Sequence, residues 1–452
     1  MGGGISGLSV AYFLSKRGLR VLLLEKEKRF GGKIRTVRED GYTVEAGPNA
    51  FLSSKPHAAH LAEELGIGDR VCEANQRANR RFLFVNGRLV EIPVTPGAFF
   101  KTELVSLRAK LRLLLEPFIP KGESEDETVA SFVTRRLGRE FLRAFVDPMA
   151  SGIYAGVPER MSMRAAFPLV WRLEREHGSL IRGMLKLALV RKGRGESGPA
   201  GGGRLLSFLG GVGELVEALE SCLRERVDMR LSTPARLFPV SGGWVVEYGT
   251  EAAFARAAVV STPAYAVGAV VDGLKELGLL AKRIEYAPIA VVALGFRRED
   301  VGHPLDGFGF LVARDEGMLT LGVLWDSSIF PNRAPGERVL MRVMLGGARN
   351  PVVAELDEEE LYQRALEEVG NILDFRSEPE RVWIFKYDRG IPQYGMGHAD
   401  LVDRMEGIAE AKGLFLHSNA YRGVGFSDCI GNAALVADKV VRYLGYGGDS
   451  HS

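Results

Sequence analysis

The chain of 452 residues carries 59 lysines and arginines against 57 aspartates and glutamates, a formal charge of +2. Hydrophobic residues make up 46% and charged residues 26%, which excludes a disordered chain. The near-neutral balance argues against a dedicated nucleic-acid surface, and the length suggests two or three domains. Cys72, Cys222 and Cys429 are too few and too far apart for a disulfide framework or a zinc site, which favours a reducing compartment.

The chain has no apolar run of the about 20 residues that a membrane-spanning helix needs. Met1 is followed directly by glycines rather than by a signal peptide. We therefore expect a cytoplasmic protein, and attachment to the inner face of the cell membrane stays open.

The first residues match a dinucleotide-binding pattern. Gly2, Gly4 and Gly7 fit the G-x-G-x-x-G template, and an apolar helical repeat begins at Ile5 and ends before Gly18, which can close it in a left-handed conformation. Glycines let a backbone approach a pyrophosphate, and the helix N-terminus offers it free N–H groups. A tight turn is the alternative reading of the glycines alone.

A buried strand is predicted next, over Val21–Leu24, and it ends in Glu25. An acid about 20 residues after the glycines binds ribose hydroxyls in this fold. The template also places a buried strand before the first glycine, where this chain has only Met1. Without that strand, we expect weaker dinucleotide binding and lower stability.

A second glycine pair, Gly31-Gly32, opens the next stretch. Alternating apolar residues over 34–39 and 42–45, joined by Asp40-Gly41, predict a hairpin. The glycine pair is either another turn or a second backbone approach to the same dinucleotide.

Residues from about 100 to 185 are rich in helix-forming patterns. Leucines at 104, 107, 111, 114 and 115 predict an apolar face on a helix over 99–118, among basic residues. This face is expected to pack on the core, with a membrane-surface helix as the alternative. The glycine-rich stretch from Arg191 to Arg204 is expected to be a loop.

The second half returns to strands. We expect strands between 228 and 261, forming a meander that ends in a buried strand at 257–261, then strands near 289–296, 319–325 and 339–345 and a helix over 357–373. Near the C-terminus, a strand at 413–417 precedes a glycine loop and a helix over about 427–444, with Ser427 or Asp428 as its N-cap.

These motifs together resemble the flavin amine-oxidase superfamily. The resemblance rests on Gly2 to Gly7, on Gly31-Gly32, and on Gly-Val-Gly-Phe-Ser-Asp-Cys-Ile at 423–430. Asp-Pro-Met-Ala-Ser-Gly-Ile-Tyr-Ala-Gly at 147–156 and Ile-Pro-Gln-Tyr-Gly-Met-Gly-His at 391–398 are similar to the protoporphyrinogen and coproporphyrinogen oxidase family within it.

The resemblance implies an α/β fold: a discontinuous Rossmann-like FAD-binding domain with a mixed-sheet substrate domain and a helical insertion. We expect the FAD domain at 1–80, 205–270 and 405–452, the helical insertion at 81–204, and the substrate domain at 271–404. The helical insertion is the part that would face a membrane.

The resemblance also implies the activity: FAD-dependent oxidation of a porphyrinogen to the porphyrin in heme biosynthesis, by successive hydride transfers, with O2 as acceptor. Protoporphyrinogen IX and coproporphyrinogen III both stay open as substrates, as does a homodimer. The alternatives are another flavoprotein of this type, acting on amines or a carotene, and a non-catalytic tetrapyrrole-binding protein.

Site residues follow from the resemblance as well. The predicted cofactor contacts are Gly2, Gly3, Gly4, Ile5, Ser6, Gly7, Glu25, Lys26, Gly32, Lys33, Gly47, Pro48, Asn49, Ala50, Ala235, Asn419, Val424, Gly425 and Phe426. The predicted substrate contacts are Gly152, Ile153, Tyr154 and Lys101, with core packing as an equal alternative for Tyr154. His398 is a candidate proton carrier, although a structural histidine is the commoner case. We expect no metal, and no general base is assigned.

Overall fold

The computed structural model describes residues 1–193 and 203–446. Two parallel strand pairs form the nucleotide-binding part: β1 (Leu22–Leu24) with β9 (Asp228–Arg230), and β13 (Ala258–Val260) with β19 (Leu414–Leu416). Met1 lies between them: its amino group donates to Val259 O at 2.9 Å, and its carbonyl accepts from Ser261 N at 2.8 Å. Gly2 N donates to Leu24 O at 2.8 Å, so two residues bridge both pairs.

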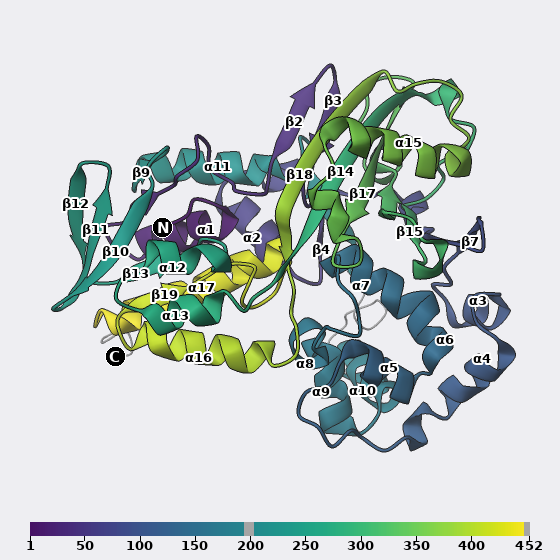
Figure 1. Cartoon of the computed structure of the whole chain (residues 1–452), viewed down its shortest axis with the longest axis horizontal. Coiled ribbons are helices and arrows are strands. Elements are labelled where there is room, and N and C mark those ends of the chain that lie inside the picture. Colours follow the sequence, from purple (N-terminus) through teal and green to yellow (C-terminus); the bar gives the residue numbers. More distant parts are fainter. Residues whose placement is uncertain (194–202, 447–452) are drawn as a thin grey trace.

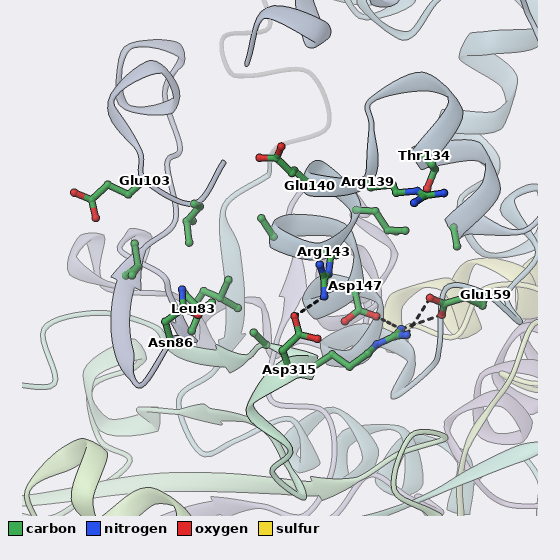
Figure 2. A pocket seen from close by; sticks show the side chains of 18 of the residues that line it. Leu83, Asn86, Glu103, Thr134, Arg139, Glu140, Arg143, Asp147, Glu159 and Asp315 are labelled. Atoms are coloured by element: carbon green, nitrogen blue, oxygen red, sulfur yellow. Dashed lines mark hydrogen bonds and ion pairs between the residues drawn. The ribbon is translucent and has the colours of Figure 1, made fainter. Parts of the chain in front are cut away.

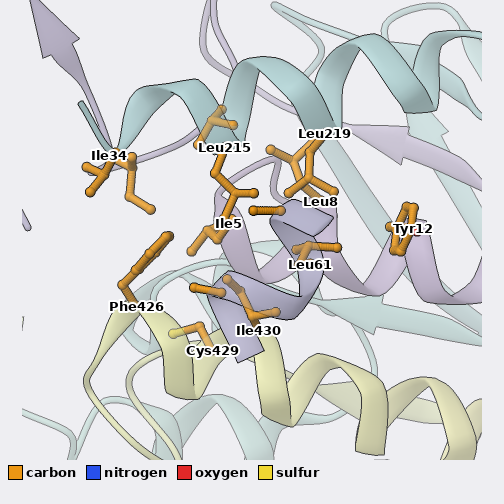
Figure 3. Close-up of a cluster of buried hydrophobic side chains, with 14 of the residues drawn as sticks. Ile5, Leu8, Tyr12, Ile34, Leu61, Leu215, Leu219, Phe426, Cys429 and Ile430 are labelled. Carbon is orange, nitrogen blue, oxygen red and sulfur yellow. The ribbon is translucent and has the colours of Figure 1, made fainter. Parts of the chain in front are cut away.

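Four helices cover this part (Figure 1): α1 (Ile5–Lys16), α2 (His57–Glu64), α11 (Gly213–Arg224) and α17 (Phe426–Tyr443). Their apolar faces meet in one cluster that includes Leu8, Leu61, Leu215 and Ile430 (Figure 3). Full burial of each such side chain contributes about 1.5–3 kcal/mol. The predicted α1, with Gly18 at φ +76° after it, is confirmed. The two ends of the chain therefore pack against each other.

The predicted meander is confirmed as β10 (Ala235–Val240), β11 (Gly243–Tyr248) and β12 (Glu251–Ala255), all antiparallel, and it precedes β13. The predicted hairpin is β2 (Thr36–Glu39) with β3 (Tyr42–Glu45). Asp40 at φ +49° and Gly41 at φ +79° form its turn. A small antiparallel sheet joins β4 (Phe51–Leu52), β8 (Leu205–Phe208) and β5 (Val71–Glu73).

The large sheet has seven strands in the order β18-β14-β17-β16-β15-β6-β7. They span Arg381–Pro392, Tyr286–Arg297, Arg338–Gly346, Thr320–Leu324, Gly309–Val312, Phe82–Val85 and Arg88–Glu91. One face packs on α15 (Glu358–Leu373), which a capping box of Asp357 and Glu360 begins, and the hairpin β2–β3 contributes Tyr42 and Val44 to a second cluster on the sheet. The expected strands and helix of this region are confirmed.

A helical segment lies beside the sheet (Figure 1). Its α-helices are α3 (Pro96–Lys101), α4 (Leu107–Leu114), α5 (Val129–Arg136), α6 (Arg139–Phe141), α7 (Asp147–Tyr154), α8 (Met163–Ala166), α9 (Pro168–His177) and α10 (Leu180–Gly193). A π-helical turn, Leu142–Val146, leads directly into α7. Further helices are α12 (Val267–Val270), α13 (Lys275–Ala281), α14 (Asp326–Ile329) and α16 (His398–Glu410), of which α12, α13 and α16 share a buried cluster with β13 and β19.

The prediction of a core-facing helix over 99–118 is wrong. The stretch breaks into α3 and α4, and α4 turns its leucines outward, with Leu107 70% and Leu111 55% exposed. Lys110 is buried instead, because its ammonium group donates to the carbonyls of Phe100 (3.0 Å) and Thr102 (2.6 Å).

Among the described residues, we find no helix of the length and apolarity that crossing a membrane requires, and no cluster of ligands that could hold a metal ion. Most of the expected loop at 191–204 lies outside the described residues.

Candidate active site

The glycine loop before α1 is tight enough to require glycine. A Cβ built on Gly7 would lie 1.8 Å from the carbonyl oxygen of Gly2, and Gly2 itself has φ +95°. The N-cap of α1 is Gly4, and no side chain caps it. The positive end of the helix is therefore open to an anion that can approach the bare backbone.

Glu25 lies at this loop, as the spacing predicts. Its carboxylate is buried and accepts from Gly3 N at 2.6 Å and Glu27 N at 2.9 Å. The backbone carbonyl of Glu25 accepts from Thr233 N at 2.8 Å, which brings Ala235, at the start of β10, to the same end of the sheet. The neighbouring predicted residue, Lys26, is exposed and forms a surface ion pair with Glu27.

The second glycine pair contacts the first loop. Gly31 N donates to Gly3 O at 2.8 Å, and Gly4 and Gly31 form a parallel bridge. A Cβ on Gly32 would lie 3.2 Å from the Cα of Gly4, and Gly32 has φ +59°. The two glycine loops thus present one continuous backbone surface.

Lys33 leaves this surface toward the large sheet. Its ammonium group donates to Arg389 O at 2.8 Å and to Gly390 O, and it lies 5.4 Å from the ring centroid of Tyr286. Burial lowers the pKa of Lys33 to about 8.

Residues 45–50 contain the predicted flavin contacts Gly47 to Ala50, and after that prediction we call them the flavin-lining segment. Buried side chains hold this segment in place. The Arg342 guanidinium donates to the carbonyls of Glu45 (2.8 Å) and Gly47 (2.9 Å), and it also binds both carboxylate oxygens of Asp326, at 2.9 and 3.0 Å. Asn49 O accepts from Ser207 Oγ at 2.7 Å.

A second arginine supports the same segment. Arg333 is 0% exposed and donates to Ser207 Oγ at 2.8 Å. The Glu45 carboxylate accepts from Thr36 Oγ1 (2.6 Å) and Val212 N (2.7 Å), and burial raises its pKa. The sequence interpretation missed both arginines. The position of Arg342, a charged residue inside an apolar strand, is the one signal that could have indicated a role for it.

The C-terminal glycine loop precedes α17, whose N-cap is Gly425 with no side-chain cap. The predicted N-cap, Ser427 or Asp428, is therefore wrong by two or three residues. The Ser427 hydroxyl instead donates to Lys55 O at 2.6 Å, and Asp428 forms an ion pair with Lys55. Because α1 packs on α17 (Figure 3), both uncapped helix ends belong to one compact unit.

Orphaned polar atoms next to the first loop fit a dinucleotide. A Cβ on Gly2 would meet the backbone of Ser261 at 2.9 Å. The buried hydroxyl oxygens of Ser261 and Thr262 have no hydrogen-bond partner within the described residues. Buried polar atoms are nearly always satisfied in proteins. Two open hydroxyls, two uncapped helix ends and a buried acid are what phosphates and a ribose require.

Three of the four predicted substrate residues lie on α7. A Cβ on Gly152 would meet Leu311 of the large sheet at 2.9 Å, so α7 packs closely on the sheet there, and Ile153 is 47% exposed. The Tyr154 hydroxyl donates to Ala166 O at 2.7 Å and its ring joins a buried cluster, which supports the core-packing alternative. Lys101 lies exposed at the end of α3, and no contact among the described residues links it to α7.

A cavity of about 990 Å³ lies beside the N-terminal end of α7 (Figure 2). Ion pairs neutralise several of its charges: Arg143 with Asp315, and Arg314 with Asp147 and Glu159. Its lining includes none of the predicted cofactor or substrate residues.

Arg81 is a cation that the sequence interpretation did not single out. Its guanidinium lies 5.0 Å from the ring centroid of Phe308, burial lowers its pKa, and it forms no ion pair within residues 1–193 and 203–446. Phe308 packs in the same cluster as Ala50. Arg81 therefore lies over a ring whose cluster also includes Leu205 of the small sheet and Ala50 of the flavin-lining segment.

His398 is structural. It is buried, and its Nε2 donates to Tyr421 O at 3.1 Å. It also stacks on Tyr394 with ring centroids 4.2 Å apart.

The fold and this site are those of a dinucleotide-binding protein of the α/β class. The model of the family "Flavin containing amine oxidoreductase" matches residues 5–441. The chain belongs to that family, and its cofactor is FAD.

Relatives of similar length match nearly the full length of this chain. Mitochondrial protoporphyrinogen oxidase of Nicotiana tabacum is 31% identical over 98% of this chain and 94% of its own length. Coproporphyrinogen III oxidase of Bacillus subtilis (strain 168) is 28% identical over 98% and 97%.

The solved structures agree. A protein of Exiguobacterium sp. 255-15, provisionally assigned as protoporphyrinogen oxidase, superposes with a TM-score of 0.83 at 27% identity, over 98% of each chain. UDP-galactopyranose mutase, at 16% identity and a TM-score of 0.72, shares the fold.

Proposed function

We propose that the protein oxidises a porphyrinogen to the porphyrin, with FAD, in heme biosynthesis. The observation that carries this proposal is the convergence of three glycine-containing stretches, 2–7, 31–32 and 423–425, in a chain whose near full-length relatives are named for porphyrinogen oxidation. FAD, when bound, supplies the acceptor for one hydride in each of three successive oxidations.

Residues of the chain bind and orient the cofactor. Gly2 to Gly7 and the N-terminus of α1 bind the pyrophosphate, and Glu25 orients the ribose. The flavin-lining segment and the stretch 424–426 enclose the isoalloxazine. Arg342 and Arg333 fix that segment from the large sheet through the hydrogen bonds described above.

Substrate binding is assigned to α7 and to Arg81. Gly152 and Ile153 are exposed and present a surface against which a tetrapyrrole can lie. The propionate groups of a porphyrinogen are anions, and a guanidinium binds carboxylates with charge-assisted hydrogen bonds. Arg81, without an acidic partner among the described residues, offers such a group.

Oxygen is the proposed terminal acceptor. Removal of six electrons and six protons from one porphyrinogen then consumes three O2 and releases three H2O2. The test is an aerobic assay of the FAD-loaded protein with protoporphyrinogen IX and with coproporphyrinogen III, following porphyrin fluorescence and peroxide. No fluorescence gain above the spontaneous rate with either substrate refutes the proposal, and the ratio of the two rates identifies the preferred substrate.

Peripheral membrane contact is proposed for the outward face of α4 and the turn after it. Leu107, Leu111, Leu114, Leu115 and Phe118 are between 55% and 78% exposed there. Apolar side chains at this spacing, flanked by basic residues, suit an interfacial helix.

Flotation with vesicles of anionic phospholipid tests this contact. Leu111→Ser should lower the bound fraction. Leu435→Ser on α17, where Leu435 is 60% exposed, is the matched control and should not. Equal binding of both variants and the parent refutes the contact.

A further inference from the structure

The stretch 393–398, here called the linking segment, runs from β18 to α16 and contacts both halves of the site. We propose that Tyr394 in this segment is a positioning residue that fixes the flavin loop, residues 417–426, relative to the substrate helix α7. The inference rests on the proposed function, because it assigns α7 to the substrate and the loop to FAD.

On the α7 side, the linking segment is held by one side-chain hydrogen bond and by backbone pairing. Gln393 Nε2 donates to Tyr154 O at 2.8 Å, at the C-terminal end of α7. Ser162 N donates to Tyr394 O at 2.8 Å, and Met161 and Gly395 form an antiparallel bridge. The linking segment therefore moves with α7 and the residues that follow it.

On the flavin side, two side chains reach the loop. The Tyr394 hydroxyl donates to Asn419 O at 2.7 Å, and His398 Nε2 lies 3.1 Å from Tyr421 O. Since a carbonyl oxygen only accepts, the histidine carries its proton on Nε2. Burial lowers the pKa of His398, so the ring is neutral and this tautomer persists.

The two side chains support each other. Their rings stack with centroids 4.2 Å apart and an interplanar angle of 14°. Tyr394 is 1% and His398 4% exposed, so neither has freedom to move independently. The Tyr394 ring also lies 5.6 Å from the Tyr154 ring of α7. One buried tyrosine thus contacts the substrate helix through its ring and the flavin loop through its hydroxyl.

This arrangement has a consequence for the reaction. The transfer of hydride requires reacting atoms within about 3–3.5 Å, and a displacement of about 1 Å can cost about a hundredfold in rate. Asn419 and the stretch 424–426 approach FAD from the flavin loop, whereas Gly152 and Ile153 approach the substrate from α7. Tyr394 connects these two groups of residues: its hydroxyl bonds Asn419 O, and its ring lies against Tyr154, which follows Gly152 and Ile153 on α7.

The test variant is Tyr394→Phe, which keeps the ring and the stack and removes only the bond to Asn419 O. Tyr362→Phe on α15 is the control, since its hydroxyl bonds Glu378 far along the chain from the flavin loop. The first readout is amide hydrogen exchange of residues 417–426 in the FAD-free protein. The loss of one hydrogen bond predicts about fivefold faster exchange of these residues in Tyr394→Phe. The control variant should exchange them at the rate of the parent protein.

The second readout is single-turnover flavin reduction by the porphyrinogen in FAD-saturated protein. Tyr394→Phe should reduce its flavin at least about fivefold more slowly, with KM and FAD content unchanged. A role in folding alone would lower FAD content or raise KM instead, and that result overturns the proposal.

Exchange and reduction rates equal to those of the parent also overturn it. If the parent protein itself oxidises no porphyrinogen, the proposed function fails, and the exchange of the flavin loop decides the role of Tyr394 by itself.

Discussion

The buried ion pair between Arg342 and Asp326 should be among the most sensitive points of the molecule. The two side chains are 1% and 2% exposed, and Arg342 also holds the carbonyls of Glu45 and Gly47. Arg342→Met leaves a carboxylate buried without its charged partner, which costs about 3–5 kcal/mol. We therefore expect the free energy of unfolding to fall by that amount.

Arg381→Met is the matched control. Arg381 pairs with Asp40 at 2.7 Å, but the two side chains are 54% and 51% exposed, so its loss should cost no more than about 1 kcal/mol. Adding Asp326→Asn to Arg342→Met should recover a large part of the stability, because the uncompensated charge is then removed.

Urea unfolding of the FAD-free protein, followed by tryptophan fluorescence, measures all four proteins. The buried Trp325 adjoins Asp326 and should report this region. A loss in Arg342→Met that is no larger than in Arg381→Met would refute the reasoning, and so would a double variant as unstable as the single one.

Three further outcomes follow from the site. Gly7→Ala places a Cβ against Gly2 O, and such overpacking costs about 1–3 kcal/mol. We therefore expect roughly tenfold to hundredfold weaker FAD binding in a flavin-fluorescence titration, and an unchanged Kd would contradict this expectation. Arg81→Leu should raise the KM for the porphyrinogen about tenfold with kcat retained, and steady-state kinetics with an unchanged KM would exclude its role. Burial lowers the pKa of Lys33 to about 8, whereas the unfolded chain holds that proton up to about 10.5. The FAD-free protein should therefore gain stability from this group as the pH rises from 8 to 10.5, and Lys33→Met should abolish that gain in urea titrations at each pH.

Local patterns predicted the nucleotide-binding part well because its signals are short-range. The glycines before α1, the cap at Gly18 and the Asp40-Gly41 turn each depend on backbone conformations that few residues adopt. The amphipathic spacing of α15 with its capping box was equally readable. In each case, the residues that determine the structure are within a few positions of it.

The orientation of α4 could not be read in the same way. A leucine face predicts burial in general, but here Lys110 finds two carbonyl acceptors in the preceding turn, and that local bond sets the rotation of the helix. The N-cap of α17 was misplaced for a related reason. Ser427 and Asp428 have good capping side chains, yet Lys55, distant in sequence, engages both.

The support of the flavin-lining segment was invisible to the sequence for another reason. Arg342 binds a backbone carbonyl 297 residues away in the chain, and Arg333 binds a serine hydroxyl 126 residues away, and neither kind of acceptor is distinctive in a sequence. Buried arginines of this kind give little net stability, since desolvation offsets their attraction to the acids. What they do give is one defined position for the backbone at Glu45 and Gly47. Both arginines belong to the part of the chain that includes the large sheet, so this part sets the position of the flavin-lining segment. The same sheet contacts α7 through Leu311. Under the proposed function, the large sheet thus positions both the substrate residues and the cofactor residues, which is the condition for a short and reproducible transfer distance.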